Sequence, residues 1–362
     1  MTDTRPLAEL TLVEAALRYV PVVVSFIAST TDTLVPYAPR CDPTAATAFV
    51  RRHPILRSPS STRPTRTHRR VLETPSPHDK AAMTDEIHAL WAKGAIVVTY
   101  DPNSPHVPPP SRPARDGRVN LVEPGKAPRL GKGGSPESRV AILHSLAHIE
   151  SWAIDLSWDI IARFGQVRAM PRAFFDDFVL VAADEARHFR MLAARLVELG
   201  SEYGALNAHD GLWDSATETA DSLEARLVIE HCVHEARGLD VLPATIAKFR
   251  KNGDEASAAL LEGTIYPEEV THCAAGVRWF RYLHARDVEK KDAGEGGQCV
   301  DLADEGGGPD EGVVKAFHET VWAHFKGVLK PPFNDEARSK AGFGKEWYMP
   351  LTQRPTVPGA GA

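Results

Sequence analysis

Apolar residues recur every three or four positions in four long stretches of the second half of the chain, the spacing of helices that bury one face. These stretches cover residues 136–164, 171–200, 216–251 and 254–286. The first two begin at a proline, and the first three end close to a glycine, as helices commonly do. We therefore predict an all-α fold built on a four-helix bundle over residues 139–286.

Shorter elements are expected on both sides of this bundle. Thr11-Leu12-Val13-Glu14 has the pattern of a capping box, which starts a helix. Apolar residues on one face also predict a helix that begins near Ser76 and ends at Gly94. The predicted parts are an N-terminal helix in 1–20, a helix and a wrapping segment in 76–138, a Gly-rich acidic loop in 287–312, C-terminal helices in 313–345 and a tail in 346–362.

Residues 21–75 break the helical pattern. Positions 21–70 contain eight Arg and two Asp and neither Lys nor Glu, among many Pro, Ser and Thr. Such a composition does not build a packed element, so we predict a disordered basic insertion. Three interpretations stay open: an arm that binds an acidic partner, an insertion without function, and a retained intron in the gene model.

The overall composition is ordinary for a globular protein: 362 residues, 43% hydrophobic and 25% charged, with a net charge of -6. The acidic balance gives no general reason to expect nucleic acid or an anionic membrane as partner. Four scattered cysteines fit free thiols better than disulfides or a zinc site. No secretory signal and no membrane-spanning run is apparent, so a cytoplasmic location without membrane association is expected.

The candidate chemistry lies in a pattern that occurs twice in the bundle. A lone Glu is followed 35 residues later by Glu-x-x-His in the first copy and 34 residues later in the second. All six residues fall on the apolar stripes of their helices, where uncompensated carboxylates would be costly. The candidate metal ligands are Glu150, Glu185, His188, Glu235, Glu269 and His272.

This set is that of a carboxylate-bridged two-metal site in a four-helix bundle. Glu and His at i, i+3 lie on one side of one helical turn, so both reach a shared metal. Oxygen-rich coordination with imidazole favours two iron ions, with manganese as an alternative. Glu185 and Glu269 are the natural bridges, and Glu150 and Glu235 are terminal ligands. A single Glu-x-x-His would more commonly be a surface pair, but two at matched spacing are hard to obtain by chance.

Further polar residues near the ligands are candidates for orienting them. The aspartates could accept the second N–H of a ligand histidine or pair with a neighbouring arginine. For the two histidines, a core position with a backbone partner is the alternative. The candidates are His148, Asp155, Asp184, Arg187, His231, Arg237 and Asp240.

Several of these motifs together resemble the ferritin-like domain-of-unknown-function family 455. The matching motifs include Asp184-Glu185-Ala186-Arg187-His188, His209-Asp210-Gly211-Leu212-Trp213 and Pro332-Phe333-Asn334. The resemblance covers roughly residues 75–345 and implies a ferritin-like bundle related to the di-iron tRNA hydroxylases. One departure is Tyr266-Pro267, because a proline there should kink or restart the fourth helix just before Glu269.

The expected function is a non-haem di-iron or Mn/Fe oxidoreductase that activates dioxygen, as a hydroxylase or monooxygenase. Such an enzyme needs an external electron donor, because the chain has no nucleotide-binding glycine motif. A small-molecule substrate is favoured over tRNA, and the sequence leaves a homodimer open. The alternatives are a metal-binding or oxidant-scavenging protein that makes no organic product, and a tRNA-modifying hydroxylase that uses a local basic patch between Arg112 and Lys132.

Overall fold

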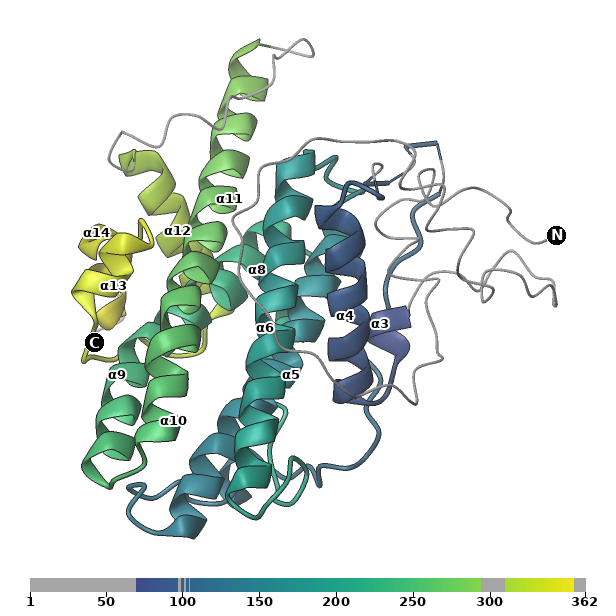
Figure 1. The fold of residues 1–362 in the computed structure, drawn as a ribbon. Coiled ribbons are helices and arrows are strands. Elements are labelled where there is room, and N and C mark those ends of the chain that lie inside the picture. Colours follow the sequence, from purple (N-terminus) through teal and green to yellow (C-terminus); the bar gives the residue numbers. More distant parts are fainter. Residues whose placement is uncertain (1–69, 97–98, 101, 104, 294–309, 355–362) are drawn as a thin grey trace, which may run out of the picture.

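In the computed structural model the regular elements of the described residues are helices, joined by irregular segments (Figure 1). It describes residues 70–96, 99–100, 102–103, 105–293 and 310–354. Within these ranges the only β-type pairing is an isolated bridge between Leu121 and Ala208, so the all-α prediction is confirmed. The predicted N-terminal helix in 1–20 and most of the predicted insertion lie outside the described residues.

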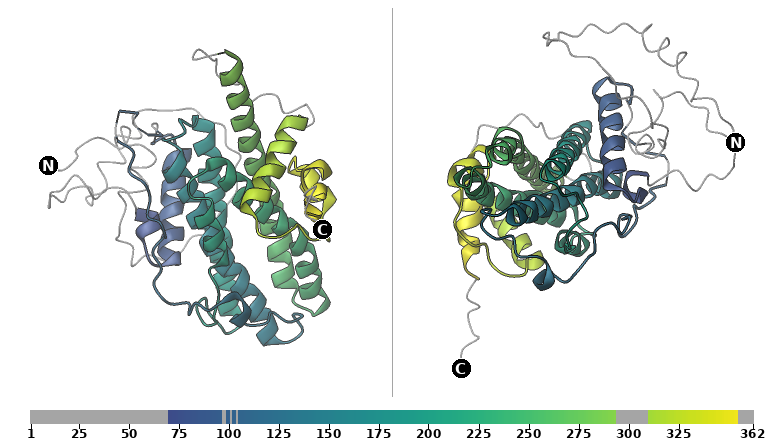
Figure 2. Two further views of the ribbon diagram at one scale, coloured as in Figure 1. Left: turned by 180° about the vertical axis from the view of Figure 1, so that it is seen from behind. Right: turned by 60° about the horizontal axis from the view of Figure 1, so that its bottom comes forward.

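Four long helical runs form the centre of the molecule. The first two are α5 (Pro136–Phe164) and α6 (Arg172–Glu198). The third run consists of α8 (Leu223–Val228), the π-helical turn η4 (Ile229–His234) and α9 (Glu235–Lys251). The fourth run consists of α10 (Glu255–Leu260), the π-helical turn η5 (Leu261–Ile265) and α11 (Tyr266–Ala293). α5 packs mainly on α6 and α9 packs on α10 and α11, while α11 also contacts α6. Figure 2 shows these pairs side by side from two further directions.

The first two runs begin and end where the sequence predicts. Ser135 caps α5, because its hydroxyl accepts a hydrogen bond from the backbone N–H of Ser138, and Pro136 occupies the first turn. α6 follows directly after Pro171. α5 is buried on nearly all sides between residues 150 and 161, which explains its high apolar content.

The third run differs from the predicted continuous helix over 216–251. The chain instead forms α7 (Gly211–Glu218), turns, and starts again at α8. Ser222 causes this new start, because its hydroxyl accepts a hydrogen bond from the N–H of Ala225. A serine followed by a good helix-forming segment was the signal for this boundary.

The fourth run changes its helical geometry at the place where a kink or restart was predicted. Pro267 lies in the first turn of α11, directly after the π-helical turn η5. A π-helical turn changes the hydrogen-bond spacing and so accommodates a proline that cannot donate, and α11 begins there without a gap in the helical run. It also extends to Ala293, so the predicted bundle end at 286 and the loop over 287–312 are wrong at their boundaries. Val288-Glu289-Lys290-Lys291 contains good helix formers, which allows the extension.

Helices from the N-terminal part of the described chain cover one side of the bundle. α3 (Arg70–Glu73) contacts α5, and α4 (Pro77–Ala92) packs on α6 (Figure 1). The predicted disordered insertion over 21–75 is therefore too long, because Val71 and Leu72 of α3 are buried. Between α4 and α5 the chain wraps over the surface with only the short 3-10 turn η3 (Pro124–Lys126), as predicted for a wrapping segment.

Helices from the C-terminal part cover the opposite side. α12 (Glu311–His324) contacts α8, and α13 (Asp335–Lys340) contacts α9 and α11. The predicted tail over 346–362 begins too early, because α14 (Lys345–Tyr348) and the 3-10 turn η7 (Met349–Thr352) bury Trp347, Tyr348 and Leu351. Among the described helices, none combines the length and the apolar character needed to cross a bilayer.

Candidate metal centre

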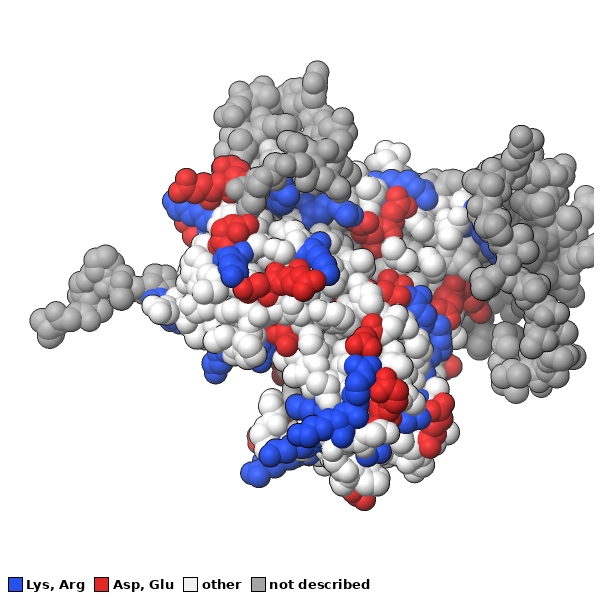
Figure 3. Space-filling model, turned by 60° about the vertical axis from the view of Figure 1, so that its left-hand side comes forward, with Lys and Arg blue, Asp and Glu red and all other residues white. Residues whose placement is uncertain are grey.

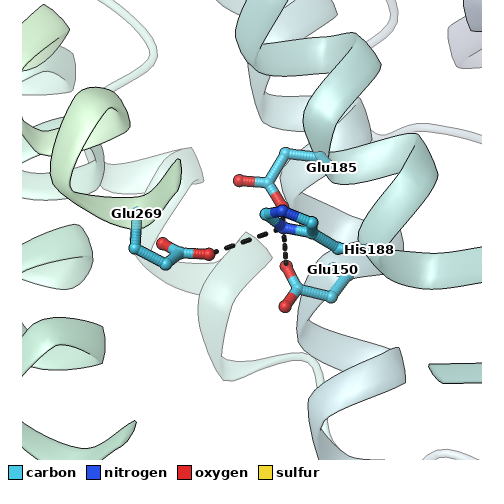
Figure 4. Close-up of side chains that lie close together, drawn as sticks. All are labelled: Glu150, Glu185, His188 and Glu269. Carbon is cyan, nitrogen blue, oxygen red and sulfur yellow. Dashed lines mark ion pairs between the residues drawn. The ribbon is translucent and has the colours of Figure 1, made fainter. Parts of the chain in front are cut away.

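The six predicted ligand residues meet in the middle of the bundle. Their donor atoms form two overlapping groups, each with all atoms within 4.8 Å of one another. The first group is Glu150, Glu185, His188 and Glu269, and the second is Glu185, Glu235, Glu269 and His272. Figure 4 shows the first group, to which α5, α6 and α11 contribute. The two groups share Glu185 and Glu269, the residues predicted to bridge.

The two shared carboxylates each turn one oxygen to each histidine. His188 Nδ1 lies 3.5 Å from Glu185 Oε2 and 3.6 Å from Glu269 Oε1. His272 Nδ1 lies 3.0 Å from Glu185 Oε1 and 3.9 Å from Glu269 Oε2. Glu150 Oε2 completes the first group at 3.9 Å from His188 Nδ1. This division of oxygens is the arrangement that two metals bridged by two carboxylates require.

Several donor atoms of these groups have no other role in the protein. Within the described part of the chain, Glu185 Oε2, His188 Nδ1 and His272 Nδ1 are buried without a hydrogen-bond partner. Buried polar atoms are normally satisfied, so three unsatisfied atoms in one place call for a binding partner. A set of four carboxylates and two imidazoles fits iron or manganese by its chemistry. The residues present therefore fit the predicted pair of metals.

The remote nitrogen of each histidine is held by a carboxylate from the facing helix. His188 Nε2 lies 2.7 Å from Glu268 Oε2, and His272 Nε2 lies 3.3 Å from Asp184 Oδ2. An imidazole that donates through Nε2 to a carboxylate keeps the lone pair of Nδ1 free for a metal. Asp184 and Glu268 each directly precede one of the two shared glutamates. The two halves of the site therefore orient their histidines in the same way.

One arginine links these two outer carboxylates. The Nη2 atom of Arg187 lies 2.7 Å from Asp184 Oδ1 and 2.6 Å from Glu268 Oε2. The predictions for Asp184 and Arg187 therefore agree with the structure. Glu268 was missed, although it aligns with Asp184 when the two Glu-x-x-His motifs are superposed. The repeat itself was the signal that could have identified it.

Charge in the centre is balanced by the two imidazoles. Burial alone would lower the pKa of His188, but the carboxylates of Glu150, Glu185 and Glu268 beside the ring raise that pKa far above its ordinary value. The pKa of His272 is raised in the same way, against the effect of burial, mainly by the charge of Glu185. In the metal-free protein both rings are therefore protonated, and their positive charge stands where metal charge would act.

The carboxylates respond to burial and to each other. Burial, and then repulsion from neighbouring carboxylates, raises the pKa values of Glu150, Glu235 and Glu269. Glu185 is the exception: burial opposes its ionisation, but the nearby charge of His272 and the proximity of both imidazoles bring its pKa below the ordinary value. The centre thus holds one firmly ionised bridge among carboxyl groups that gain protons readily.

Asp155 and Asp240 do not contact the ligand histidines, but the other predicted role, a pair with a neighbouring arginine, agrees with the structure for Asp240, whose Oδ2 lies 3.6 Å from Arg237 Nη1. Each lies five residues after a lone Glu and pairs with a buried cation from outside the bundle. Lys80 Nζ of α4 lies 2.6 Å from Asp155 Oδ1, and Arg338 Nη2 of α13 lies 2.6 Å from Asp240 Oδ2. Burial lowers the pKa of Lys80 to about 8, although the carboxylate opposes this. The two aspartates therefore anchor the flanking helices, one on each half.

The remaining three candidates also lie outside both ligand groups. His148 is buried and bonds through Nδ1 to the hydroxyl of Tyr203, 3.0 Å away. Arg237 is exposed, donates to the carbonyl of Lys330 and pairs with Asp240 as predicted, whereas the prediction of a role beside the ligands is wrong for His148. His231 packs against Phe178 with ring centroids 4.9 Å apart, which corresponds to the core histidine kept as the alternative.

Local backbone features bring the third and fourth runs to the centre. The π-helical turn η4 ends directly before Glu235, and such turns commonly occur at functional sites. The run also approaches α11 closely, because a Cβ atom at Gly276 would lie 2.1 Å from the carbonyl oxygen of His231. Pro243 inside α9 releases the carbonyl of Leu239, which accepts a hydrogen bond from Asn334 Nδ2 instead.

Comparison with known proteins places the chain in a family but not in a reaction class. The family model described as "Protein of unknown function (DUF455)" matches residues 73–349. An uncharacterised protein from Haemophilus influenzae is 29% identical over 290 residues, which cover 78% of this chain and 92% of that protein. No solved structure matches the chain, so the ferritin-like resemblance of the bundle stays a prediction. The chain belongs to the DUF455 family of proteins of unknown function.

Proposed function

We propose that the protein is a non-haem oxidoreductase that binds two iron ions, or one manganese and one iron, and activates dioxygen to hydroxylate a small molecule. The observation that carries this proposal is the division of the Glu185 and Glu269 oxygens between two imidazoles. A site for a single metal would need only one such group. Two groups that share both bridging carboxylates are suited to a pair of metals that act together.

Each residue has a defined part in this proposal. Glu185 and Glu269 would be shared between the metals, while Glu150 with His188 and Glu235 with His272 would hold the two ends. When bound, the metals supply the electrons and the coordination positions at which dioxygen is reduced.

The protein contributes negative charge and fixed geometry. The carboxylates offset the positive charge of the metals, and Asp184 and Glu268 keep each imidazole in the orientation that directs Nδ1 inward. The Nδ1 atoms of His188 and His272 would give up their protons to solvent on taking the role of ligands. An oxygenase of this kind would need electrons from an external donor.

A tRNA substrate has less support, because most of the basic patch predicted between Arg112 and Lys132 is neutralised. The pairs are Arg112 with Asp210, Arg115 with Asp155, Arg118 with Asp116 and Lys126 with Glu123. Figure 3 shows one face of the molecule, where basic side chains gather in a strip near the lower end and otherwise alternate with acidic ones. A small molecule therefore remains the favoured substrate, and the tRNA hydroxylase remains the lesser alternative.

The test is to load the metal-free protein with ferrous iron without oxygen and then add one portion of dioxygen. The proposal predicts uptake of two irons per chain and a dioxygen consumption that depends on Glu185. A fraction of small metabolites should then yield a product that carries an oxygen atom from isotopically labelled dioxygen. Dioxygen consumption without any labelled product in metabolite or tRNA fractions would favour the scavenging alternative. Failure to bind iron or manganese would contradict the proposal.

A further inference from the structure

Two glycines inside the helices of the bundle have opposite surroundings. Gly276 in α11 is required by packing, because a Cβ atom there would lie 2.1 Å from the His231 carbonyl oxygen. Gly238 in α9 is not required by packing, because a Cβ atom there would meet only Glu269 Oε2, at an ordinary contact distance of 3.8 Å. Glycine weakens a helix relative to alanine, and alanine would fit at position 238. No protein atom therefore explains the glycine.

The neighbour that a side chain at Gly238 would meet is an atom of the metal centre. Gly238 lies three residues after Glu235, on the stripe of α9 that faces the shared carboxylates. The donor atoms of this centre include the three buried atoms that lack a hydrogen-bond partner among the described residues, Glu185 Oε2, His188 Nδ1 and His272 Nδ1. A side chain at 238 would thus occupy space directly beside the place where metals and their reaction partner meet.

The same side of α9 is where solvent comes nearest to the centre. Glu235 and Gly238 are both partly exposed, whereas the other five ligand residues are at most 7% exposed. At the equivalent position of the first half, three residues after Glu150, Ala153 is buried. Among the described residues, the centre is therefore more exposed to solvent on the side of α9 than on the side of α5.

The residues around Gly238 on α9 are of two kinds. Leu242, one turn later, is buried and Val241 is 39% exposed, while His234 is partly exposed and Arg237 is exposed. The acidic groups nearest to Gly238 are the ligand carboxylates of Glu235 and Glu269. The four ligand carboxylates would balance two divalent metals, so an uncharged small molecule suits this place better than an anion, which would add unbalanced negative charge.

We propose that uncharged small molecules reach and occupy the metal centre over Gly238, beside Glu235 and Glu269, and that the absence of a side chain at position 238 sets the size they can have. This inference rests on the proposed function, since it assumes metals in the centre. It adds the route, the class of molecule and the residue that limits its size. Helix stability is given up at this position to keep the space open, as is common at functional sites.

The test uses the full chain loaded with ferrous iron and nitric oxide as an uncharged diatomic probe. The variants are Gly238→Ala and Gly238→Leu, with Gly263→Ala in η5 as control, where a Cβ atom would meet nothing within 4 Å. We expect all variants to keep the iron content of the unaltered protein. Nitric oxide should bind about tenfold more slowly or more weakly to Gly238→Leu, with Gly238→Ala between the two and the control unchanged.

A second measurement is independent of the metals. The melting temperature of the metal-free protein should rise in Gly238→Ala, because alanine fits there and favours the helix. If Gly238→Leu loses iron or does not fold, Gly238→Ala decides. Unchanged nitric oxide binding in an iron-loaded Gly238 variant would overturn the inference and leave the proposed function intact. Failure of the unaltered protein to bind iron would overturn both.

Discussion

The two halves of the bundle carry the same ligand pattern on different backbones. α5 and α6 are continuous α-helices, and their lone Glu, Glu150, is buried. The second half reaches the same centre through two π-helical turns, η4 and η5, and Glu235 stays partly exposed. The ligand set is therefore symmetric, but its exposure is not: the lone Glu of the first half is buried, and that of the second half, where the backbone changes its helical geometry, is partly exposed.

Away from the ligand residues, the two halves of the bundle carry equivalent buried ion pairs. Asp155 in the first half and Asp240 in the second each hold a buried cation from a flanking helix. The bundle is therefore stabilised by matched ion pairs at its two sides, although its two inner surfaces differ. Each of the following predictions tests one level of this comparison.

The largest effect, on the number of metals bound per chain, is expected from substitutions of the shared and the terminal ligands. Glu185→Ala removes an oxygen from both groups and should abolish binding of both metals. Glu150→Ala and Glu235→Ala should each leave one metal per chain, because each belongs to one group only. Elemental analysis of the reloaded proteins measures this, with the exposed Glu255→Ala as control. Equal metal loss in all three ligand variants would show that the centre does not divide into two groups.

The second prediction compares the two buried ion pairs. Arg338→Met leaves Asp240 only the half-exposed Arg237, whose Nη1 lies 3.6 Å from Oδ2, and should lower the free energy of unfolding by about 3 to 5 kcal/mol. Lys80→Met should cost less, because Arg115 Nη2 still lies 2.5 Å from Asp155 Oδ2. Urea unfolding of the metal-free proteins measures both changes. Adding Asp240→Asn to Arg338→Met should restore part of the loss, and no recovery would mean that packing rather than charge accounts for it.

The third prediction concerns the single arginine that serves both halves. Arg187→Ala should weaken metal binding at both ends by about 10- to 100-fold, because Asp184 and Glu268 lose the group that fixes them. Arg237→Ala is the matched control, since Arg237 occupies the equivalent place after Glu235 but bonds to the Lys330 carbonyl. Cobalt titrations followed by absorbance measure both affinities. Weakening at one end only would contradict the shared role.

The smallest effect is expected from pH, and it should be common to both halves. The pKa values of His188 and His272 are raised, so their contribution to the stability of the metal-free protein is full below the ordinary histidine pKa and is lost as pH rises. Metal must displace these protons, so its affinity should increase between about pH 6 and pH 8. The rise in melting temperature on adding metal should grow over this range. A rise that shrinks with pH would contradict the assigned protonation.

Much of the fold followed from periodicity and helix-end signals. Ser135, Pro136 and Pro171 define the first two helices, because caps and first-turn prolines act locally. The break before Ser222 and the π-helical turns were not predicted. A π-helical turn depends on what the neighbouring helix requires, such as the close contact at Gly276, and that requirement is not visible in the local pattern.

In the candidate site, too, features of single helices could be predicted and features that depend on packing between distant segments could not. The six ligand residues could be predicted because their spacing and their helical stripes are properties of single helices. The partners of Asp155 and Asp240 could not, because Lys80 and Arg338 are distant in sequence and only packing brings them near. Glu268 could have been found by extending the repeat one residue beyond the ligands.

The central claim is tested most directly by anomalous diffraction at the iron absorption edge from crystals of the iron-loaded protein. The account predicts two peaks, one beside His188 Nδ1 and the other beside His272 Nδ1, with Glu185 and Glu269 in contact with both. One peak, or peaks away from these two nitrogens, would contradict a two-metal centre shared by the halves of the bundle.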